Sequence, residues 1–285
     1  MLIDTHTHVI SPDAANFPAA PLGGHQSSWS QERPVDAAGL LRAMDKSGVD
    51  KAVVVQASTV YGHDNRYVAE TVKLHKDRMA GVFSADVLAA DAVAQISRWL
   101  DAGLSGLRLF TTGSTMPGQA GWLDDPRSFP AWAFCEAHDI PVCLQMTADG
   151  IPMLRGLLNK FPKVRVLLDH LARPQLQDGP PYKLAASLFA LADEPGVYLK
   201  LTSRNLAGAA SGQSSLQDFF AALLPRFGSG RIAWGSNFPA AEEPLAEITQ
   251  TAREALAPLA PADRDAIFAG TALSLYPALK DAKHD

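Results

Sequence analysis

Short runs of apolar and β-branched residues alternate along this chain with longer segments whose apolar positions recur every three or four residues. The first pattern is typical of strands covered on both faces, and the second is typical of amphipathic helices. Glycine or proline stands at most junctions between them, for example at Gly48, Gly103, Pro141 and Gly196. Strands are predicted over residues 2–8, 51–56, 79–84, 106–110, 141–146, 164–169, 197–202 and 231–236. Helices are predicted over residues 37–47, 65–75, 92–101, 128–138, 150–161, 182–193, 216–225, 244–256 and 261–279.

This alternation predicts an α/β protein with one domain over residues 1–285, built as a (β/α)8 barrel of the TIM type. An open, doubly wound sheet is the alternative. Eight evenly spaced units within about 235 residues favour the barrel, in which active sites lie at the carboxyl ends of the strands.

The segment 10–35 breaks this rhythm, because it is rich in Pro, Gly, Ala and Ser and fits neither a helical nor a strand period. A connection this long without regular structure is usually functional or disordered. Since it leaves the first strand at its carboxyl end, we expect it to form a lid over the active site. Segments 113–125 and 203–217 follow the fourth and seventh predicted strands, and we expect them to form further loops at the same rim.

Composition narrows the function classes. The chain has 285 residues, of which 47% are hydrophobic, and its net charge is −5 with no basic run. This balance gives no support for nucleic acid or an anionic membrane as a partner. Its two cysteines, Cys135 and Cys143, lie in apolar segments and are expected to be buried free thiols of a reducing compartment. The chain opens on a strand without a signal-peptide pattern, and no apolar run approaches the roughly 20 residues of a membrane helix, so we expect a cytoplasmic protein.

Two histidines in the first predicted strand are the first sign of chemistry. Because side chains alternate along a strand, Asp4, His6 and His8 are expected on one face, opposite Ile3 and Thr5. Buried imidazoles are costly unless they bind a metal, hydrogen-bond a partner or take part in a reaction. A histidine pair at a strand end without any function is the alternative interpretation.

The other strand ends favour a functional interpretation. Residues at the carboxyl ends of barrel strands converge on one pocket. Nearly every predicted strand ends in, or is closely followed by, a group that can form hydrogen bonds or titrate. These groups include His6, His8, Gln56, His63, Ser84, Asp86, Arg108, Gln145, Asp169, His170, Arg173, Lys200, Thr202, Ser236 and Asn237. A barrel with a purely structural role would not need them, so the sequence predicts a polar active-site pocket.

Several motifs in strand order resemble a known family. They are residues 4–8 (DTHTH), 53–56 (VVVQ), 106–108 (GLR), 168–174 (LDHLARP) and 234–239 (WGSNFP), with 270–276 (GTALSLY) near the end. Together they are similar to the amidohydrolase-related (amidohydrolase 2) branch of the amidohydrolase superfamily, and within it to lactonases acting on 2-pyrone-4,6-dicarboxylate and on sugar acids. The resemblance covers nearly the whole chain. It implies a hydrolase, active in catabolism, that opens a small carboxylated cyclic ester by water attack at the carbonyl.

Two departures from the family pattern concern a metal. Gln145 stands where many superfamily members have a metal-ligand histidine, and Asn237 stands where most have an aspartate that serves as ligand and general base. Amide oxygens are weak ligands for divalent transition metals, and an amide accepts no proton at neutral pH. The resemblance therefore implies either no required cofactor or a divalent Zn or Mn on His6 and His8, completed by Gln145, Asn237 or His170.

Roles for individual residues follow from these considerations. We expect His6, His8, His170 and Asn237 to be catalytic, with His170 as the leading general base and its tautomer fixed by Asp169 or a nearby carbonyl. A neutral or charged imidazole of His6 or His8 would polarise the carbonyl, and Asn237 would orient water. The expected substrate-binding residues are Arg108, Gln56, His63, Gln145, Lys200 and Arg173.

Some of these expectations have alternatives. Arg108 suits a substrate carboxylate, but an ion pair with Asp86 or another acid of the rim would equally explain it. Trp29 and Trp122 either cover a flat substrate ring or simply pack the loops. For the whole protein, a metal-dependent decarboxylase or hydratase and a non-catalytic ligand-binding relative are the alternatives to a lactonase. The expected partner is a small anionic molecule, and assembly into a homo-oligomer is left open.

Overall fold

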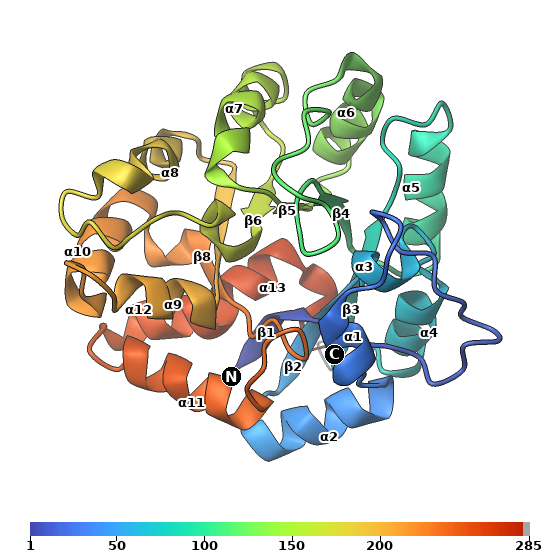
Figure 1. The fold of residues 1–285 in the computed structure, drawn as a ribbon, viewed down its shortest axis with the longest axis horizontal. Coiled ribbons are helices and arrows are strands. Elements are labelled where there is room, and N and C mark those ends of the chain that lie inside the picture. Colours follow the sequence, from blue (N-terminus) through green and yellow to red (C-terminus); the bar gives the residue numbers. More distant parts are fainter. Residues whose placement is uncertain (282–285) are drawn as a thin grey trace.

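The computed structural model describes residues 1–281, and residues 282–285 of the predicted domain lie outside the described part. Eight parallel strands form one sheet in the order of the chain, each paired with the next. Figure 1 shows them at the centre of a ring of helices. The strands are β1 Ile3–Thr7, β2 Lys51–Val55, β3 Met79–Ser84, β4 Gly106–Phe110, β5 Val142–Gln145, β6 Val166–Leu168, β7 Val197–Leu201 and β8 Ile232–Trp234.

The chain returns from β8 to β1 through a parallel bridge between Thr7 and Phe238. The backbone N–H groups of His8 and Asn237 donate to the carbonyls of Phe238 and His6, each at 2.8 Å. The predicted (β/α)8 barrel is therefore confirmed. The doubly wound alternative is wrong, because its strand order would reverse at a switch point instead of following the chain.

Thirteen α-helices occur among the described residues (Figure 1). They are α1 Ser28–Glu32, α2 Ala37–Ser47, α3 Ser58–Tyr61, α4 Arg66–Leu74, α5 Ala92–Asp101, α6 Phe129–Ala137, α7 Ile151–Lys160, α8 Ala186–Phe189, α9 Ser203–Ala209, α10 Leu216–Phe227, α11 Leu245–Leu256, α12 Pro261–Asp265 and α13 Thr271–Leu275. No strand end differs from its prediction by more than two residues. Local periodicity thus sufficed to locate the barrel.

Two predicted helices are broken. Segment 182–193 forms a 3₁₀ turn, the short α8 and another 3₁₀ turn. Its buried residues, Tyr182, Ala185, Leu188 and Leu191, recur every three positions, which matches the three residues per turn of a 3₁₀-helix better than an α-helix. The predicted helix 261–279 is divided into α12, a π-helical turn, α13 and a 3₁₀ turn. The short helices α1, α3 and α9 lie in segments without an extended helical pattern, and the sequence did not predict them.

The core has two layers, which explains the continuous apolar character of the strands. On β2, Val53 and Val55 pack inside the barrel, whereas Ala52 and Val54 pack against the surrounding helices. The C-terminal turns close one end of the barrel, where Tyr276 joins the inner cluster. The carboxyl ends of the strands open at the other end.

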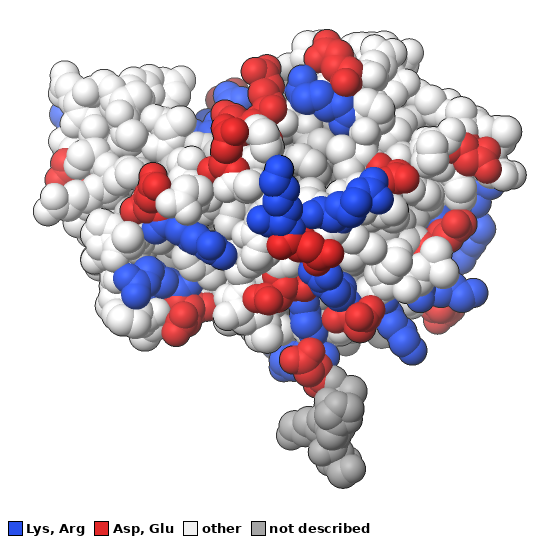
Figure 2. All heavy atoms as spheres, turned by 90° about the horizontal axis from the view of Figure 1, so that it is seen from below, with Lys and Arg blue, Asp and Glu red and all other residues white. Residues whose placement is uncertain are grey.

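The surface shows no strong charge segregation in the view of Figure 2, where Lys and Arg side chains lie interspersed with Asp and Glu. Within residues 1–281, no helix is long and apolar enough to cross a membrane.

Candidate active site

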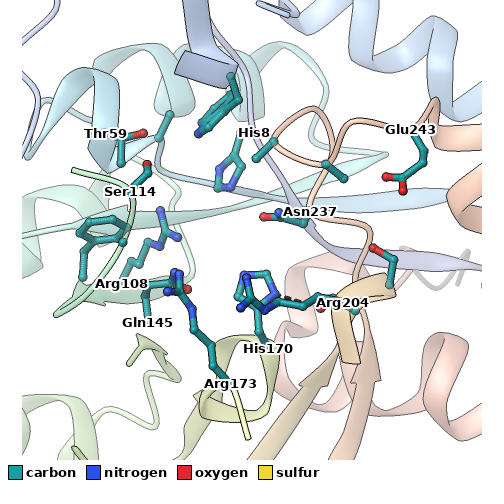
Figure 3. A pocket seen from close by; sticks show the side chains of 18 of the residues that line it. His8, Thr59, Arg108, Ser114, Gln145, His170, Arg173, Arg204, Asn237 and Glu243 are labelled. Atoms are coloured by element: carbon teal, nitrogen blue, oxygen red, sulfur yellow. Dashed lines mark hydrogen bonds between the residues drawn. The ribbon is translucent and has the colours of Figure 1, made fainter. Parts of the chain in front are cut away.

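A pocket of 390 Å³ lies at the carboxyl ends of the strands (Figure 3). Its polar side chains come from segments far apart in sequence, which include the end of β1, helix α3, strands β4 and β5, the loops after β4, β6 and β8, and the junction of β7 with helix α9. The lining residues are His8, Trp29, Ala57, Thr59, Arg108, Phe110, Gly113, Ser114, Gln145, His170, Arg173, Thr202, Ser203, Arg204, Ala207, Asn237, Ala240, Ala241 and Glu243. Trp29 belongs to the 10–35 segment, so the expected lid contributes one wall.

An irregularity in β1 aims its two histidines into the barrel. Asp4 pairs with Ala52 and Thr7 pairs with Val54, so β1 contains one more residue than β2 over this stretch. Such a bulge changes which residues face inward. Ile3 packs in the inner cluster, yet His6 also faces the interior, with its ring centroid 5.1 Å from that of His170.

The expected strict alternation of β1 is therefore wrong between Asp4 and His6. The carboxylate of Asp4 accepts hydrogen bonds from the backbone N–H groups of His6 at 2.9 Å and Ser236 at 2.8 Å, which holds the bulge against the loop after β8. Burial raises the pKa of Asp4 to about 6. Beyond the bulge His6 and His8 share one side, as expected, with ring centroids 4.9 Å apart.

His8 has a fixed tautomer. Its Nδ1 lies 2.7 Å from the backbone carbonyl oxygen of Val55, which accepts but cannot donate, so Nδ1 carries the proton. Its Nε2 therefore has the free lone pair. The Trp29 ring stacks on the imidazole at 5.5 Å between centroids. Burial, together with the nearby Arg108 guanidinium, lowers the pKa of His8 to about 3, so the ring is neutral at neutral pH.

His170 is fixed by a longer chain of hydrogen bonds. The amide nitrogen of Asn205 donates to the carbonyl of His170 at 2.8 Å, and its amide oxygen accepts from the backbone N–H of Thr202 at 3.0 Å. That oxygen also accepts from the Thr202 hydroxyl at 3.0 Å. Since the Thr202 hydroxyl proton is already engaged, the hydroxyl oxygen accepts from Nδ1 of His170 at 2.9 Å.

The Nε2 of His170 consequently holds a lone pair, as in His8. Burial, with Arg173 nearby, lowers the pKa of His170 to about 3. The expected tautomer partner, Asp169 or a carbonyl, is wrong: the partner is the Thr202 hydroxyl, because Asp169 is engaged on the other side.

A left-handed turn directs His170 and Arg173 to the pocket. Four consecutive residues after Asp169 have positive φ, from His170 (53°) through Leu171 and Ala172 to Arg173 (53°). A positive φ at a residue other than glycine costs roughly 1–2 kcal/mol, so the surrounding structure must impose the turn. Asn237, at the opposite wall, also has a positive φ of 63°.

A cluster of buried charges lies beneath the pocket. The Asp169 carboxylate is fully buried and contacts the Lys200 ammonium at 2.7 Å, the Cys143 thiol at 3.0 Å and His6 Nδ1 at 3.5 Å. Arg108 approaches its second oxygen at 3.6 Å. Burial alone would raise the pKa of Asp169, but Lys200, His6 and Arg108 together hold it well below its ordinary value.

The pocket wall above this cluster carries an excess of positive charge. Arg108, Arg173 and Arg204 line it, against one carboxylate, that of Glu243 (Figure 3). Burial and the neighbouring Arg204 lower the pKa of Arg173 from its ordinary value, which indicates a cation short of anionic partners. With the Gln145 amide turned so that its nitrogen faces Asp169, its oxygen accepts from Arg173 at 2.7 Å. This arrangement suits an anionic ligand.

The structure brings together His8, Arg108, Gln145, His170, Arg173 and Asn237 at one pocket, as the sequence predicted. It does not bring the other four candidates there. His6 and Lys200 are fully buried below it. The Gln56 amide nitrogen donates to the carbonyls of Gly62 and Asp64, so this side chain holds a loop. His63 faces a different cavity, lined also by Trp122.

The Arg108 side chain lies between the pocket and a buried acid. It lines the pocket and pairs with an acid, but that acid is Asp169 and not Asp86. Its guanidinium also donates to the backbone carbonyl of Gln56 at 2.6 Å, which fixes its direction.

A model of the amidohydrolase family matches residues 3–278 of the chain. The protein belongs to the amidohydrolase family. The predicted family resemblance is thus confirmed, since the match spans almost the entire sequence.

Three similar proteins extend this comparison. An L-fucono-1,5-lactonase of Burkholderia ambifaria is 28% identical over 196 residues, which cover 68% of this chain and 66% of the lactonase. The chain therefore matches just under two thirds of that relative. A candidate 2-pyrone-4,6-dicarboxylic acid hydrolase of Pseudomonas putida has a TM-score of 0.78 at 22% identity, with 98% of both chains covered. A Burkholderia multivorans amidohydrolase with bound zinc has a TM-score of 0.75 at 21% identity, covering 97% of this chain and 99% of the other.

Divalent metals are common in the amidohydrolase family. Within residues 1–281, no three His, Cys, Asp or Glu side chains gather in an arrangement that could hold a metal ion. The carboxylate nearest the imidazoles, Asp169, is already paired with Lys200. The positions of the usual histidine and aspartate ligands are the amides Gln145 and Asn237. These donors, with the cations of Lys200 and Arg108 beside them, do not fit a tightly held divalent ion.

Sequence reasoning missed three contributors to this amidohydrolase site. Asn205 fixes the tautomer of His170 through Thr202, and a signal existed, because Thr202 and Asn205 form a capping box at the start of α9. Arg204 and Glu243 lie in segments whose sequence carries no such signal.

Proposed function

We propose that this amidohydrolase hydrolyses a small cyclic ester bearing a carboxylate, that is, a lactone, by attack of water on the ring carbonyl. The observation that carries the proposal is His170, a neutral imidazole with its Nε2 lone pair free, in a pocket lined by three arginines. The 28% identity to a sugar-acid lactonase supports the same substrate class.

In this mechanism the substrate carboxylate binds Arg173 and Arg108, and His170 takes a proton from the attacking water. The bond between the carbonyl carbon and the ring oxygen then breaks, and His170 returns the proton to that oxygen, which gives the open hydroxy acid. Asn237 cannot serve as the base, so it orients water or donates to the developing oxyanion. The expected polarisation of the carbonyl by a neutral His8 does not hold, because its pocket-facing nitrogen has no proton to donate. The oxyanion is instead stabilised by the arginines and the Asn237 amide.

Substrate binding itself strengthens the base. Burial and the Arg173 and Arg108 charges depress the pKa of His170, and an incoming carboxylate cancels part of those charges. Its pKa therefore rises toward the range in which an imidazole is an effective general base. The binding of an anion and the activation of water are in this way coupled.

We propose further that this reaction needs no metal, since the donors around His6 and His8 do not fit one and Lys200 already supplies a buried positive charge. The two cysteines are free thiols, which supports the cytoplasm as the proposed compartment.

The test is a panel of carboxylated and neutral lactones, assayed with protein treated with a chelator and with protein given Zn or Mn. We expect turnover that is equal in both preparations, lost in His170→Ala, and kept in His138→Ala, an exposed histidine at the C-terminal end of α6. Arg173→Gln should raise KM for carboxylated lactones more than for neutral ones.

Other outcomes would favour the alternatives. Decarboxylation or hydration that requires added metal, without lactone hydrolysis, would replace this proposal by the lyase. A protein that binds lactones without turnover, and that gains activity on Asn237→Asp, would be a non-catalytic relative.

A further inference from the structure

A second cavity, of 220 Å³, lies beside the main pocket and is not used by the proposed reaction. We call it the Trp122 cavity. It is lined by Leu22, Gly23, His63, Ser84, Ala85, Asp86, Val87, Leu88, Leu109, Phe110, Met116 and Trp122. Most of this wall is apolar, and the polar groups are confined to His63, Ser84 and Asp86.

The Phe110 side chain lines both cavities and forms the wall they share. On one side the Arg108 guanidinium lies over its ring, 5.2 Å from the centroid. Gly113, which also lines the main pocket, is so close that a Cβ there would lie 2.1 Å from the ring. The partition is therefore a single aromatic ring next to the residue that binds the substrate carboxylate.

Two rim loops form the roof of the Trp122 cavity. Leu22 and Gly23 come from the 10–35 segment, whereas Met116 and Trp122 come from the loop after β4. The loops touch at Gly23, where a Cβ would lie 2.0 Å from the carbonyl oxygen of Thr115. The segment that contributes Trp29 to the main pocket thus also covers the Trp122 cavity.

The polar edge of the cavity is suited to a hydrogen-bonding ligand. Nδ1 of His63 lies 3.1 Å from the hydroxyl of Ser84. Burial lowers the pKa of His63, so its ring is neutral at neutral pH. One carboxylate oxygen of Asp86 accepts from the backbone N–H of Leu88 at 3.0 Å. A ligand hydroxyl, which both donates and accepts, suits this edge, because the Asp86 carboxylate accepts and the ring of His63 offers a donor or an acceptor according to its tautomer.

We propose that the Trp122 cavity is a subsite of the same active site and binds a hydroxylated aromatic ring carried as a substituent on the lactone. The cavity is large enough for this ring, because an apolar cavity of about 150 Å³ already accepts benzene. With the carboxylate on Arg108, the substituent passes the edge of Phe110 and its hydroxyl faces His63. Hydrolysis of such a lactone rests on the proposed function, whereas binding of the ring in the Trp122 cavity does not depend on it.

The first measurement therefore uses binding alone, with phenol as the probe, followed by ligand-observed NMR. Ala85→Leu places a larger side chain in the cavity wall, and Leu88→Phe does so from another position of the wall if the first variant folds poorly. We expect phenol to bind at least about fivefold more weakly to either variant, because the larger side chain takes up space in the cavity that the ring needs. Ala221→Leu, at an exposed position of α10, is the matched control and should bind phenol like the parent protein.

The second measurement is the ratio of kcat/KM for a hydroxyphenyl-substituted carboxylated lactone to that for its unsubstituted counterpart. We expect Ala85→Leu to lower this ratio about tenfold and Trp122→Ala to raise it for a two-ring substituent. Phenol affinity and substrate ratio that both stay at the parent values in folded Ala85→Leu and Leu88→Phe would overturn the subsite. Weakened phenol binding in a protein that hydrolyses no lactone would support the subsite and overturn only the proposed reaction.

Discussion

Replacing Lys200 by methionine tests the buried charge cluster beneath the pocket most directly. The Lys200 ammonium and the Asp169 carboxylate are both fully buried and 2.7 Å apart. Methionine keeps much of the side-chain length but removes the charge, so Asp169 loses its nearest cation. Arg108 at 3.6 Å and His6 at 3.5 Å remain as partial partners.

Breaking a buried ion pair from one side typically costs about 3–5 kcal/mol, because the remaining charge stays buried. The two remaining partners place Lys200→Met near the lower end, at about 3 kcal/mol at pH 8. A domain is stable by only about 5–15 kcal/mol, so this loss is a large share of the total. For a chain of this size it corresponds to a fall in the apparent Tm of about 6–12 °C.

The loss should shrink in acid. Burial and Lys200 hold the pKa of His6 well below its ordinary value, and removing Lys200 relieves part of that depression. In the variant, a proton bound between His6 and Asp169 replaces the missing cation as the pH falls. The folded variant then binds more protons than the folded parent, so the difference in the free energy of unfolding decreases from pH 8 to pH 5.5.

The assay is thermal unfolding followed by circular dichroism at one scan rate, at pH 8 and pH 5.5. Lys76→Met, at an exposed lysine, is the control. The double variant Lys200→Met with Asp169→Asn should lose less than the sum of its two single variants. A fall in Tm at pH 8 no greater than that of Lys76→Met, or a loss that grows in acid, would refute this account of the cluster.

Three further predictions follow from single features of the structure. Burial lowers the pKa of His8 and His170 to about 3, so the unfolded chain binds protons on both rings first, and stability falls as the pH drops from 6.5 toward 3. The pKa of Asp4 is raised to about 6, so between pH 6 and 4 the folded protein binds one proton there, which offsets one of the two histidine protons. The free energy of unfolding therefore falls by at least about 1.4 kcal/mol per pH unit in that range. Urea unfolding should show this slope, and His8→Gln should reduce it; an unchanged slope would mean that the buried ring is not neutral. Thr202→Val should lower kcat about 10- to 100-fold with little change in KM, because His170 loses the acceptor that fixes its tautomer, whereas Thr202→Ser should retain activity; equal kcat in both variants would contradict that role. Cys135 and Cys143 should not react with a thiol reagent until the protein unfolds, since burial raises the pKa of each to about 12; rapid labelling of the native protein would contradict their burial.

The sequence by itself determined the barrel and most of the rim. Strand and helix periods are local properties, so β3, β4, α2 and α5 have the predicted bounds. The same reasoning identified His8, Arg108, His170 and Asn237, because residues that follow parallel strands share one edge. Family motifs then indicated the amidohydrolase class, which the match over residues 3–278 confirmed.

The tertiary structure alone decided how these groups interact. The bulge after Asp4 depends on the register between β1 and β2, and no pattern within β1 reveals it. The pairing of Lys200 with Asp169 joins β7 to the end of β6, and it turned an expected substrate ligand into a buried structural cation. Likewise, the separation of His63 from the main pocket depends on one ring, Phe110. Such contacts are set by side-chain packing between distant segments, whereas sequence periodicity reports only which face of an element is buried.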